Sequence, residues 1–174
     1  MANRTKLWIA ETMRSLLSKK SIEKIRVTEI CKEAGIERPT FYYHFKDKYD
    51  LMAWMIFQDS YSVDITKLDS AAKAMEQMKK DIIFYKRAYE DNSQSPMWEY
   101  MLELFVNRER QLAMHKLGSN TLDAQTEFSI RLHSYGTLGM AREWVLKDNI
   151  TPAKTVVAMM FEAMPEGLKK ILFS

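Results

Sequence analysis

Residues 37–51 read ERPTFYYHFKDKYDL and place three adjacent aromatic side chains and a histidine ahead of a charged segment. Phe41 and Phe45 are four positions apart, so on a helix they share one face and can be buried together. The side chains around them then point elsewhere: Thr40, Tyr42, Tyr43 and His44. We expect a short helix, residues 38–45, that presents these groups to something outside the core.

The residues on either side of this stretch predict two further helices. Residues 27–34 carry apolar side chains at helical spacing, and Gly35 after them suits the left-handed conformation of a tight turn. Pro39 fits the first turn of the next helix, because the N–H that a proline lacks would find no partner there. Asp47 suits the N-cap of a helix that continues through the apolar run LMAWMIF, residues 51–57.

The whole chain is predicted to be helical, because it has only 5 Gly and 4 Pro and no run of alternating β-branched residues. Apolar periodicity predicts a first helix over residues 4–19 and a helix of about 20 residues over 71–89. Further helices are expected from Pro96 to near Gly118, from Thr121 or Asp123 to Lys147, and from Thr151 and Pro152 onward, with Pro165 ending or kinking the last one. The predicted fold class is all-α, with an N-terminal three-helix domain, residues 1–50, and a C-terminal helical domain, residues 51–174.

The composition argues against several classes of protein. The 174 residues are 47% apolar, enough for a core, and the single cysteine, Cys31, excludes an internal disulfide or a multi-cysteine metal cluster. There is no basic and then apolar leader and no apolar run approaching the roughly 18 residues of a spanning helix, so we expect a cytoplasmic protein without a membrane partner. Residues 1–50 hold 11 Lys and Arg against 7 Asp and Glu, so the positive excess of the chain, +3 overall, lies in its N-terminal third.

A helix, a glycine turn and a short second helix with outward polar groups form the arrangement of a helix-turn-helix, whose second helix enters the DNA major groove. In that interpretation Thr40 reaches a thymine methyl group or a base edge, and Tyr42 and His44 donate hydrogen bonds to phosphate oxygens. Lys46 and Lys48 neutralise phosphates at the start of the fourth helix, where free N–H groups also point outward. A tyrosine-rich turn packed as a corner between helices is the alternative that the residues leave open.

The stretch RVTEICKEAGIERPTFYYHFKDKYDLMAWM, residues 26–55, resembles the N-terminal DNA-binding domain of TetR-family transcriptional regulators. In that family a glycine turn leads to a TFYYHF-like recognition helix and then to K-x-K-x-x-L, and the similarity here covers roughly residues 5–57. The resemblance implies one set of residues near the bases and another on the phosphate backbone: Arg38, Pro39, Thr40 and Tyr43 in the first, Tyr42, His44 and Lys48 in the second. It also implies a homodimer that binds a near-palindromic operator in double-stranded DNA, in most cases as a repressor.

Two further features qualify this resemblance. The segments FYKRAYEDNSQSPMWEYM and HSYGTLGMAREWVLKDNIT are similar, more weakly, to a small subgroup that includes regulators of dihydroxyacetone kinase operons. Family members commonly have Thr at the N-cap of the second helix, where this chain has Arg26. An arginine cannot accept hydrogen bonds from the free N–H groups there, so we expect a cap weaker by ~1 kcal/mol or one shifted to Thr28. We favour a phosphate contact for Arg26, and both residues join the predicted DNA-binding set.

The resemblance also implies a dimer interface on the last two long helices. Gly136 and Gly139 would let a partner backbone approach closely, and each costs about 1 kcal/mol relative to Ala in a helix, which implies a packing reason. The predicted interface consists of Gly136, Gly139, Ala141, Val145, Val156 and Met160. Packing of these residues within one chain is the alternative.

Aromatic and methionine side chains are plentiful in the middle of the chain and predict an effector pocket there. The predicted pocket residues are Trp54, Phe57, Tyr61, Met78, Tyr85, Trp98, Met101 and Phe105. A stripe of this kind at helical spacing is more often plain core. The subgroup includes a member that works through a protein partner and lacks a small-molecule site, so the expected further partner is a small-molecule effector or a protein.

The sequence argues against an enzyme. His44, His115 and His133 fall in separate segments, there is no H-E-x-x-H motif or glycine-rich phosphate loop, and Cys31 belongs to the buried face of its helix. We expect no catalytic residue, metal or cofactor, and we interpret His115 and His133 as surface or satisfied core residues, with a place in the lining of a pocket as the less favoured alternative for either. The remaining rival is a coactivator-like protein-interaction module whose DNA binding is weak or lost.

Overall fold

The computed structural model describes residues 2–61, 64, 66–89, 97–147 and 150–173. Within these ranges the chain is helical, as predicted, and contains no strand. The elements are α1 (Ala2–Lys19), the 3-10 turn η1 (Ile22–Lys24), α2 (Val27–Ala34), α3 (Arg38–His44), α4 (Lys48–Tyr61), α5 (Leu68–Lys80), α6 (Ile82–Tyr89), α7 (Met97–Leu117), α8 (Ala124–Leu146), α9 (Ala153–Glu162) and α10 (Glu166–Leu172). No helix in the described part of the chain is both long and apolar enough to cross a membrane.

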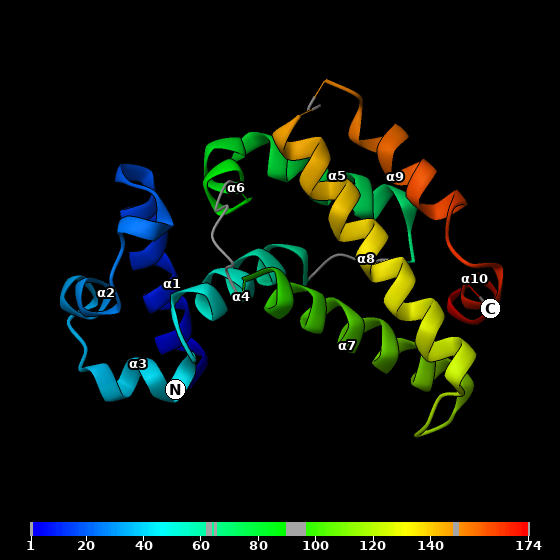
Figure 1. Cartoon of the computed structure of the whole chain (residues 1–174), viewed down its shortest axis with the longest axis horizontal. Helices are drawn as coiled ribbons and strands as arrows, with labels where there is room; N and C mark the ends of the chain where they lie inside the picture. The colour runs from blue at the N-terminus through cyan, green and yellow to red at the C-terminus, as the bar shows by residue number, and fades with distance from the viewer. Residues whose placement is uncertain (1, 62–63, 65, 90–96, 148–149, 174) are drawn as a thin grey trace.

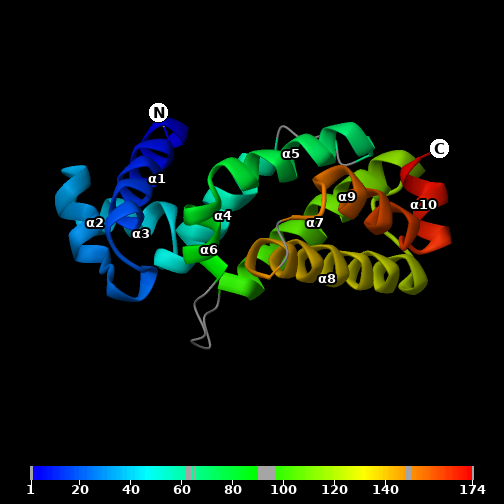
Figure 2. The ribbon, with the colours of Figure 1, turned by 90° about the horizontal axis from the view of Figure 1, so that it is seen from above.

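The helices form a small N-terminal unit and a larger C-terminal bundle (Figure 1). Helices α1, α2 and α3 pack together at one end, and α4 runs from this unit into the bundle, where it packs on α7. In the bundle α7 also contacts α8 and α10, and α5 packs on α9 (Figure 2). A helix that serves both units needs apolar side chains on several faces, as residues 51–57 provide. The domain boundary expected at residue 50 falls inside α4 and stays a prediction.

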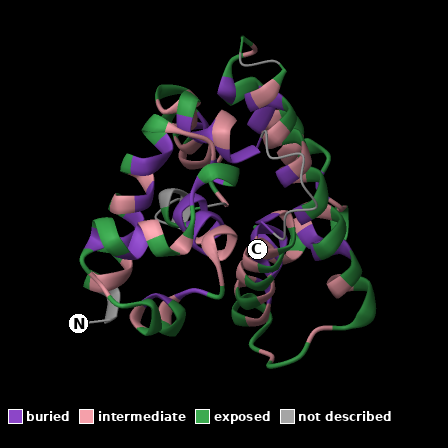
Figure 3. Cartoon of the chain, turned by 60° about the vertical axis from the view of Figure 1, so that its left-hand side comes forward, coloured by how far each residue is buried: buried purple, intermediate pink, exposed green. Residues whose placement is uncertain are grey.

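Buried side chains line the inner faces of the helices in both units (Figure 3). In the N-terminal unit Ile9, Met13 and Phe41 are fully buried, and in the bundle Met101 and Ile130 are. All of them belong to one continuous hydrophobic cluster. The two units are therefore joined by packing as well as by the chain.

The single helix expected over residues 71–89 is wrong, because the chain breaks at Asp81 into α5 and α6. Asp81 has φ −109° and ψ 37°, outside the helical region, and its N–H still donates to the carbonyl of Gln77. The apolar periodicity continues across the break, and neither a glycine nor a proline marks it in the sequence. At this break the chain contacts another helix.

That contact is the docking of α6 on α1. The carboxylate of Asp81 pairs with the guanidinium of Arg14 on α1, and the same guanidinium lies 4.1 Å from the centre of the Phe84 ring. Arg87 on α6 donates a hydrogen bond to the main-chain carbonyl of Leu17. Two arginines, one from each helix, thus hold the bundle against the N-terminal unit.

Other helix ends follow the predicted signals. Asp123 caps α8, since its Oδ1 atom accepts a hydrogen bond from the N–H of Thr126 at 2.6 Å, and this confirms one of the two expected starts. Gly118 follows α7 with a φ of 60°. Pro165 precedes α10, so the chain after the last expected helix forms a short helix of its own. The start of α7 that we predict at Pro96 lies outside the described residues.

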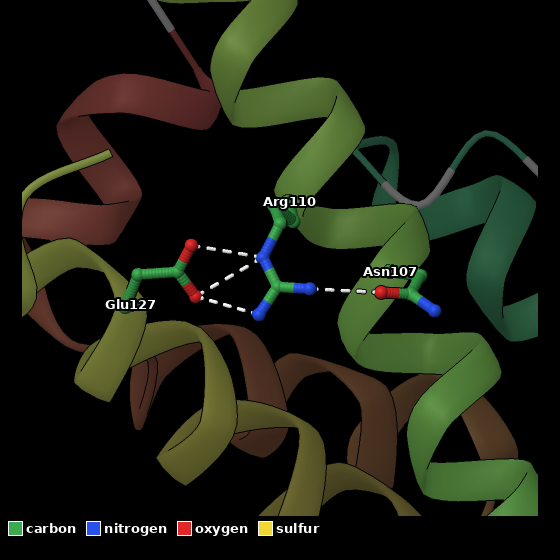
Figure 4. Close-up of polar contacts among 3 residues, drawn as sticks. All are labelled: Asn107, Arg110 and Glu127. Atoms are coloured by element: carbon green, nitrogen blue, oxygen red, sulfur yellow. Dashed lines mark hydrogen bonds and ion pairs between the residues drawn. The ribbon is translucent and has the colours of Figure 1, made fainter. Parts of the chain in front are cut away.

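A bidentate ion pair between Arg110 and Glu127 connects α7 to α8 (Figure 4). Nε of Arg110 lies 2.8 Å from Oε1 of Glu127, and Nη2 lies 2.7 Å from Oε2. The third nitrogen, Nη1, donates to Oδ1 of Asn107 at 2.8 Å, which fixes the rotation of the guanidinium. The hydrogen bonds from Arg110 lower the pKa of the Glu127 carboxyl below its ordinary value. This geometry stabilises the crossing of the two longest helices.

Glu127→Gln is expected to lower the free energy of unfolding by about 1 kcal/mol near neutral pH, because the pair is bidentate but partly exposed. The folded-state pKa of Glu127 is lowered, so its contribution is present above the unfolded-state pKa and is lost as the pH falls through the folded-state pKa. Urea unfolding at pH 7 and at pH 3 should therefore show a smaller deficit at pH 3 than at pH 7. Glu143→Gln, which removes the exposed pair with Lys147 within α8, is the matched control and should cost less than about 0.5 kcal/mol. Equal losses in the two variants would contradict a special role for the Arg110 pair.

Candidate nucleic-acid interface

The turn between α2 and α3 is built on Gly35. Gly35 has φ 63° and ψ 36°, the left-handed region in which a Cβ atom is strained. Its N–H donates to the carbonyl of Lys32 at 3.2 Å, and the N–H of Ile36 donates to the carbonyl of Cys31 at 3.0 Å. These two bonds form a Schellman motif that ends α2 and turns the chain sharply into α3.

Helix α3 is anchored on one side and open on the other. Phe41 is fully buried and Phe45 is 2% exposed, while Tyr42 is 47% and Tyr43 80% exposed. Pro39 lies in the first turn, as expected. The spacing of the two phenylalanines therefore divides the helix as the sequence predicts, with the aromatic and polar side chains on the outer face.

Ring contacts order this outer face. The Tyr42 ring meets Phe41 edge-on at 5.5 Å between centres, and the Tyr43 ring meets His44 edge-on at 4.9 Å. The guanidinium of Arg38 lies 5.7 Å from the centre of the Tyr42 ring and donates to its hydroxyl at 3.4 Å. Aromatic and cation–π contacts of this kind hold exposed side chains near one conformation. The outer face of α3 thus presents a positive charge and two hydroxyl groups that need little further ordering.

The start of α4 differs from the expectation of free N–H groups. Oδ1 of Asp47 accepts hydrogen bonds from the N–H groups of Tyr49 at 2.8 Å and Asp50 at 2.9 Å. Asp50 in turn accepts from the N–H of Lys46 at 2.8 Å. Asp47 is therefore the N-cap, as predicted, but its carboxylate occupies the groups that we expected to face a phosphate.

Tyr100 on α7 completes this cap from the bundle side. Its hydroxyl donates to Oδ2 of Asp47 at 3.0 Å. Burial and the hydrogen bond to the Asp47 carboxylate raise the pKa of Tyr100 to about 12, so the hydroxyl keeps its proton and remains a donor. The N-cap of α4 is thus also a contact between the N-terminal unit and the bundle.

Lys48 has a different role from the predicted phosphate contact. Its Nζ atom donates to the carbonyls of Ile22 at 2.8 Å, Ile25 at 2.9 Å and Glu23 at 3.2 Å. An ammonium group has three N–H donors, and here all three have main-chain acceptors at the end of η1. Lys48 therefore stabilises the connection between α1 and α2, and the phosphate contact stays a prediction for it.

Arg26 occupies the N-cap position of α2, with extended φ −106° and ψ 147°. Its side chain makes no cap hydrogen bond within the described residues, in agreement with the expectation of a weak cap, and the cap does not shift to Thr28. Of the predicted DNA-binding residues most are exposed and three are half-buried: Arg26, Thr28, Arg38, Pro39, Tyr42, Tyr43 and Lys46 in the first group, Thr40, His44 and Lys48 in the second.

A cavity of about 140 Å³ lies inside the C-terminal bundle. Four predicted pocket residues line it: Met78, Tyr85, Met101 and Phe105. Three others do not: Trp54 packs on Phe45 at 5.6 Å between ring centres, Phe57 packs on Phe105 at 5.9 Å, and Trp98 is half-buried elsewhere on α7. The side chain of Tyr61, at the end of α4, lies outside the described part of the structure.

Sequence reasoning missed the polar residues of this cavity. Glu109 on α7 lies in the charged run NRERQ, which is typical of an exposed helix face, yet it is 3% exposed. His133 on α8 lines the cavity with it, whereas His115 is exposed. The pairing of Glu109 with His133 could be predicted only if the crossing point of α7 and α8 were already known. Among the described residues no group of three His, Cys, Asp or Glu side chains is arranged to hold a metal ion.

The predicted dimer residues fall into two groups, those at the surface and those that face the interior of the protomer. Gly136 is exposed and Gly139 half-buried, but Val145 and Val156 are buried inside the protomer, and Ala141 and Met160 line the cavity. These last four face inward, because α8 and α9 bury one apolar side in their own bundle. The apolar side chains exposed on these helices are Phe128, Leu132, Tyr135 and Met140 on α8 and Met159 on α9.

Comparison with known proteins agrees with this geometry. Residues 9–54 match the model of a family described as bacterial regulatory proteins, tetR family. HTH-type transcriptional regulators of Staphylococcus aureus strains USA300 and NCTC 8325 / PS 47 are each 32% identical to this chain over 114 residues, which are 66% of this chain and 55% of each relative. The chain thus spans about half the length of these curated relatives. A TetR transcriptional regulator from Rhodococcus sp. RHA1 has a similar fold in its crystal structure, with a TM-score of 0.60 at 13% identity over 94% of this chain and 98% of that one.

Lys48→Met is expected to lower the free energy of unfolding by about 1–3 kcal/mol, because three main-chain carbonyls lose a charged donor. The measurement is urea unfolding followed by circular dichroism. Lys46→Met is the matched control: its ammonium lies 5.4 Å from the centre of the Tyr100 ring and should contribute no more than about 0.5–1 kcal/mol. A Lys48→Met protein as stable as its parent would contradict the structural role.

Proposed function

We propose that the chain, whose residues 9–54 match the model of the tetR family of bacterial regulatory proteins, is a transcriptional regulator that binds a double-stranded DNA operator as a homodimer. The observation that carries the proposal is the division of α3, whose phenylalanines are buried while its tyrosines are exposed. A helix that only formed a corner between neighbours would cover these tyrosines. The protein would work in the cytoplasm, where bacterial DNA is found.

The side chains around the outer face of α3 suit two kinds of contact with DNA, one with base edges and one with phosphates. Thr40 offers a methyl group and a hydroxyl of a size that fits a base edge in the major groove. Tyr42, His44 and Lys46 offer donors for phosphate oxygens, and Arg26 at the start of α2 adds a further positive charge. Arg38 is available to base edges or phosphates next to Tyr42, since its guanidinium is exposed.

A homodimer is supported by the exposed apolar stripe of α8. Phe128, Leu132 and Tyr135 recur at steps of four and three residues and so share one face of that helix. Gly136 and Gly139 lie beside this stripe, where the absence of side chains would let a partner helix approach. One copy of α3 contacts few bases, and a symmetric pair can read two half-sites about one helical turn of DNA apart. The proposed interface is therefore this face of α8 with Met159 of α9.

We propose that the regulator is a repressor, because a dimer that occupies an operator blocks access to the DNA beneath it. The bundle cavity supports an effector that changes operator affinity by favouring one separation of the two α3 helices. The similarity of residues 84–101 and 133–151 to regulators of dihydroxyacetone kinase operons supports membership of that subgroup, and a protein partner is the alternative to a small-molecule effector that this subgroup offers.

The alternative function is a protein-interaction module that keeps the fold but binds DNA weakly or not at all. Salt dependence separates the two functions, because an operator binder that neutralises Z phosphates loses affinity with a slope of about −0.9Z in a plot of log K against log salt. Genomic fragments retained by the protein supply the DNA for this measurement. Retention that is absent at every salt concentration would favour the interaction module.

Two sets of substitutions test the assignment of α3. Tyr42→Phe combined with His44→Ala should weaken binding to all DNA sequences by about tenfold, because each change removes one hydrogen bond to the backbone. Thr40→Ala should instead change the preferred base at one position of each half-site. Fluorescence anisotropy with selected fragments and single-base variants measures both effects. His115→Ala, an exposed histidine of α7, is the control and should bind as the parent does. Parental binding by both test proteins would contradict the recognition-helix assignment.

Leu132→Glu is expected to convert the dimer to monomers at micromolar concentration, because two-fold symmetry buries the new charge twice in one apolar interface. Sedimentation velocity measures the change in mass. Ile83→Glu on α6 is the matched control, since Ile83 is 64% exposed and lies outside the proposed interface. A Leu132→Glu dimer as stable as the parent would move the interface to another surface, and a monomeric parent would contradict the homodimer itself.

A further inference from the structure

The cavity in the bundle is apolar except where α7 meets α8. Its walls are largely methionine, alanine and aromatic side chains from α5, α6, α7, α8 and α9. Three groups with polar atoms face each other across α7 and α8: Glu109, His133 and Thr137. Arg108 also lines the cavity, and its guanidinium lies 5.9 Å from the centre of the Phe57 ring.

The polar groups form a short chain of hydrogen bonds. Nδ1 of His133 lies 2.8 Å from Oε1 of Glu109, and the Thr137 hydroxyl lies 3.3 Å from Nε2 of His133. When Glu109 is ionised its oxygen accepts, and Nδ1 of the imidazole then donates the hydrogen bond between the two groups. Both nitrogens of His133 therefore already have partners. The imidazole orients the carboxylate and offers no further group to a ligand.

The second carboxylate oxygen has no such partner. Oε2 of Glu109 is buried, and the side chain as a whole is 4% exposed. This oxygen nevertheless forms no hydrogen bond with any described residue. An unpaired buried carboxylate oxygen is costly, because it has given up its hydration without compensation. A native structure retains such a group where something else satisfies it. Because Glu109 lines the cavity, the satisfying group can come from a molecule bound there.

We propose that the cavity binds a small apolar molecule that carries an ammonium group, with the ammonium on Oε2 of Glu109. The cavity volume of about 140 Å³ is close to the roughly 150 Å³ of an apolar cavity that takes up benzene, so the apolar body is about one aromatic ring. A cationic donor suits a carboxylate in an apolar wall, since a charge-assisted hydrogen bond is about twice as strong as a neutral one. The proposal deepens the effector role given to the cavity in the proposed function.

The experiment uses the full chain without DNA, so its result is independent of whether the protein binds an operator. The probes are benzylamine, benzyl alcohol, toluene and benzoate, which share a ring and differ in the group attached to it. Isothermal titration calorimetry measures the affinities, and line broadening of the ligand NMR signals covers the weakest. Benzylamine, protonated at pH 7, should bind at least about tenfold more tightly than toluene, and benzoate should bind least.

Three variants separate the charge from the cavity. Glu109→Gln should lose about tenfold or more in affinity for benzylamine while toluene binding changes little, and Glu103→Gln, an exposed glutamate on the same helix, should behave as the parent does. Ala141→Leu fills the cavity and should abolish binding of every probe. Circular dichroism checks that each variant is folded. Equal affinities for benzylamine and toluene, or an unchanged benzylamine affinity in Glu109→Gln, would overturn the proposed ligand class; binding of no probe by the parent would overturn the cavity as a site for it.

Discussion

The burial of Phe41 and Phe45 is the constraint on which the outer surface of the N-terminal unit depends. A helix of seven residues is unstable alone in water, so α3 exists because these two side chains fix it to its neighbours. The contact of Phe45 with Trp54 on α4 joins the short helix to the long one. Each residue along a helix turns by roughly 100°, so a register shift of one position would bury a tyrosine and expose a phenylalanine. The two anchors therefore set which side chains can reach a groove of DNA.

The orientation of that helix relative to the bundle depends on polar contacts. Arg14 and Asp81 join α1 to the start of α6, and Tyr100 joins α7 to the N-cap of α4 at Asp47. Arg14 lies near the start of the N-terminal unit in the sequence, and Asp47 lies near its end. The proposed dimer, which would read two half-sites, needs both α3 helices at a fixed spacing, and a rigid connection between the N-terminal unit and the bundle would provide it. The contacts are individually modest, and they act together with the continuous core.

Local signals in the sequence predicted the parts of the fold that depend on neighbours along the chain. The turn at Gly35, the caps at Asp47 and Asp123 and the buried face of α3 all follow from spacing within a few residues. The break at Asp81 could not be predicted in this way, because its partner Arg14 lies on another helix and no glycine or proline accompanies it. Propensity and periodicity contain no information about such a partner.

The same limit applies at the candidate sites. Lys48 has the position of a phosphate contact, but its acceptors are carbonyls of the turn more than twenty residues earlier. Val145 and Val156 fit an apolar stripe, and a stripe does not say whether it faces its own core or a partner. Glu109 lies in a charged run of the sequence, and only the crossing of α7 and α8 places it against His133.

Helix α6 lines the cavity and also contacts the N-terminal unit, so it can transmit the proposed regulation from one to the other. Tyr85 and Tyr89 of α6 line the cavity, while Arg87 of the same helix holds the carbonyl of Leu17 on α1. A ligand shifts the position of α6 only by the ratio of its affinities for the two arrangements. A tenfold preference corresponds to about 1.4 kcal/mol, which exceeds the roughly 0–1 kcal/mol of an exposed ion pair such as that of Asp81 with Arg14. A ligand with modest selectivity can therefore outweigh one of the contacts that hold α6 on α1, and the orientation of α3 would change with it.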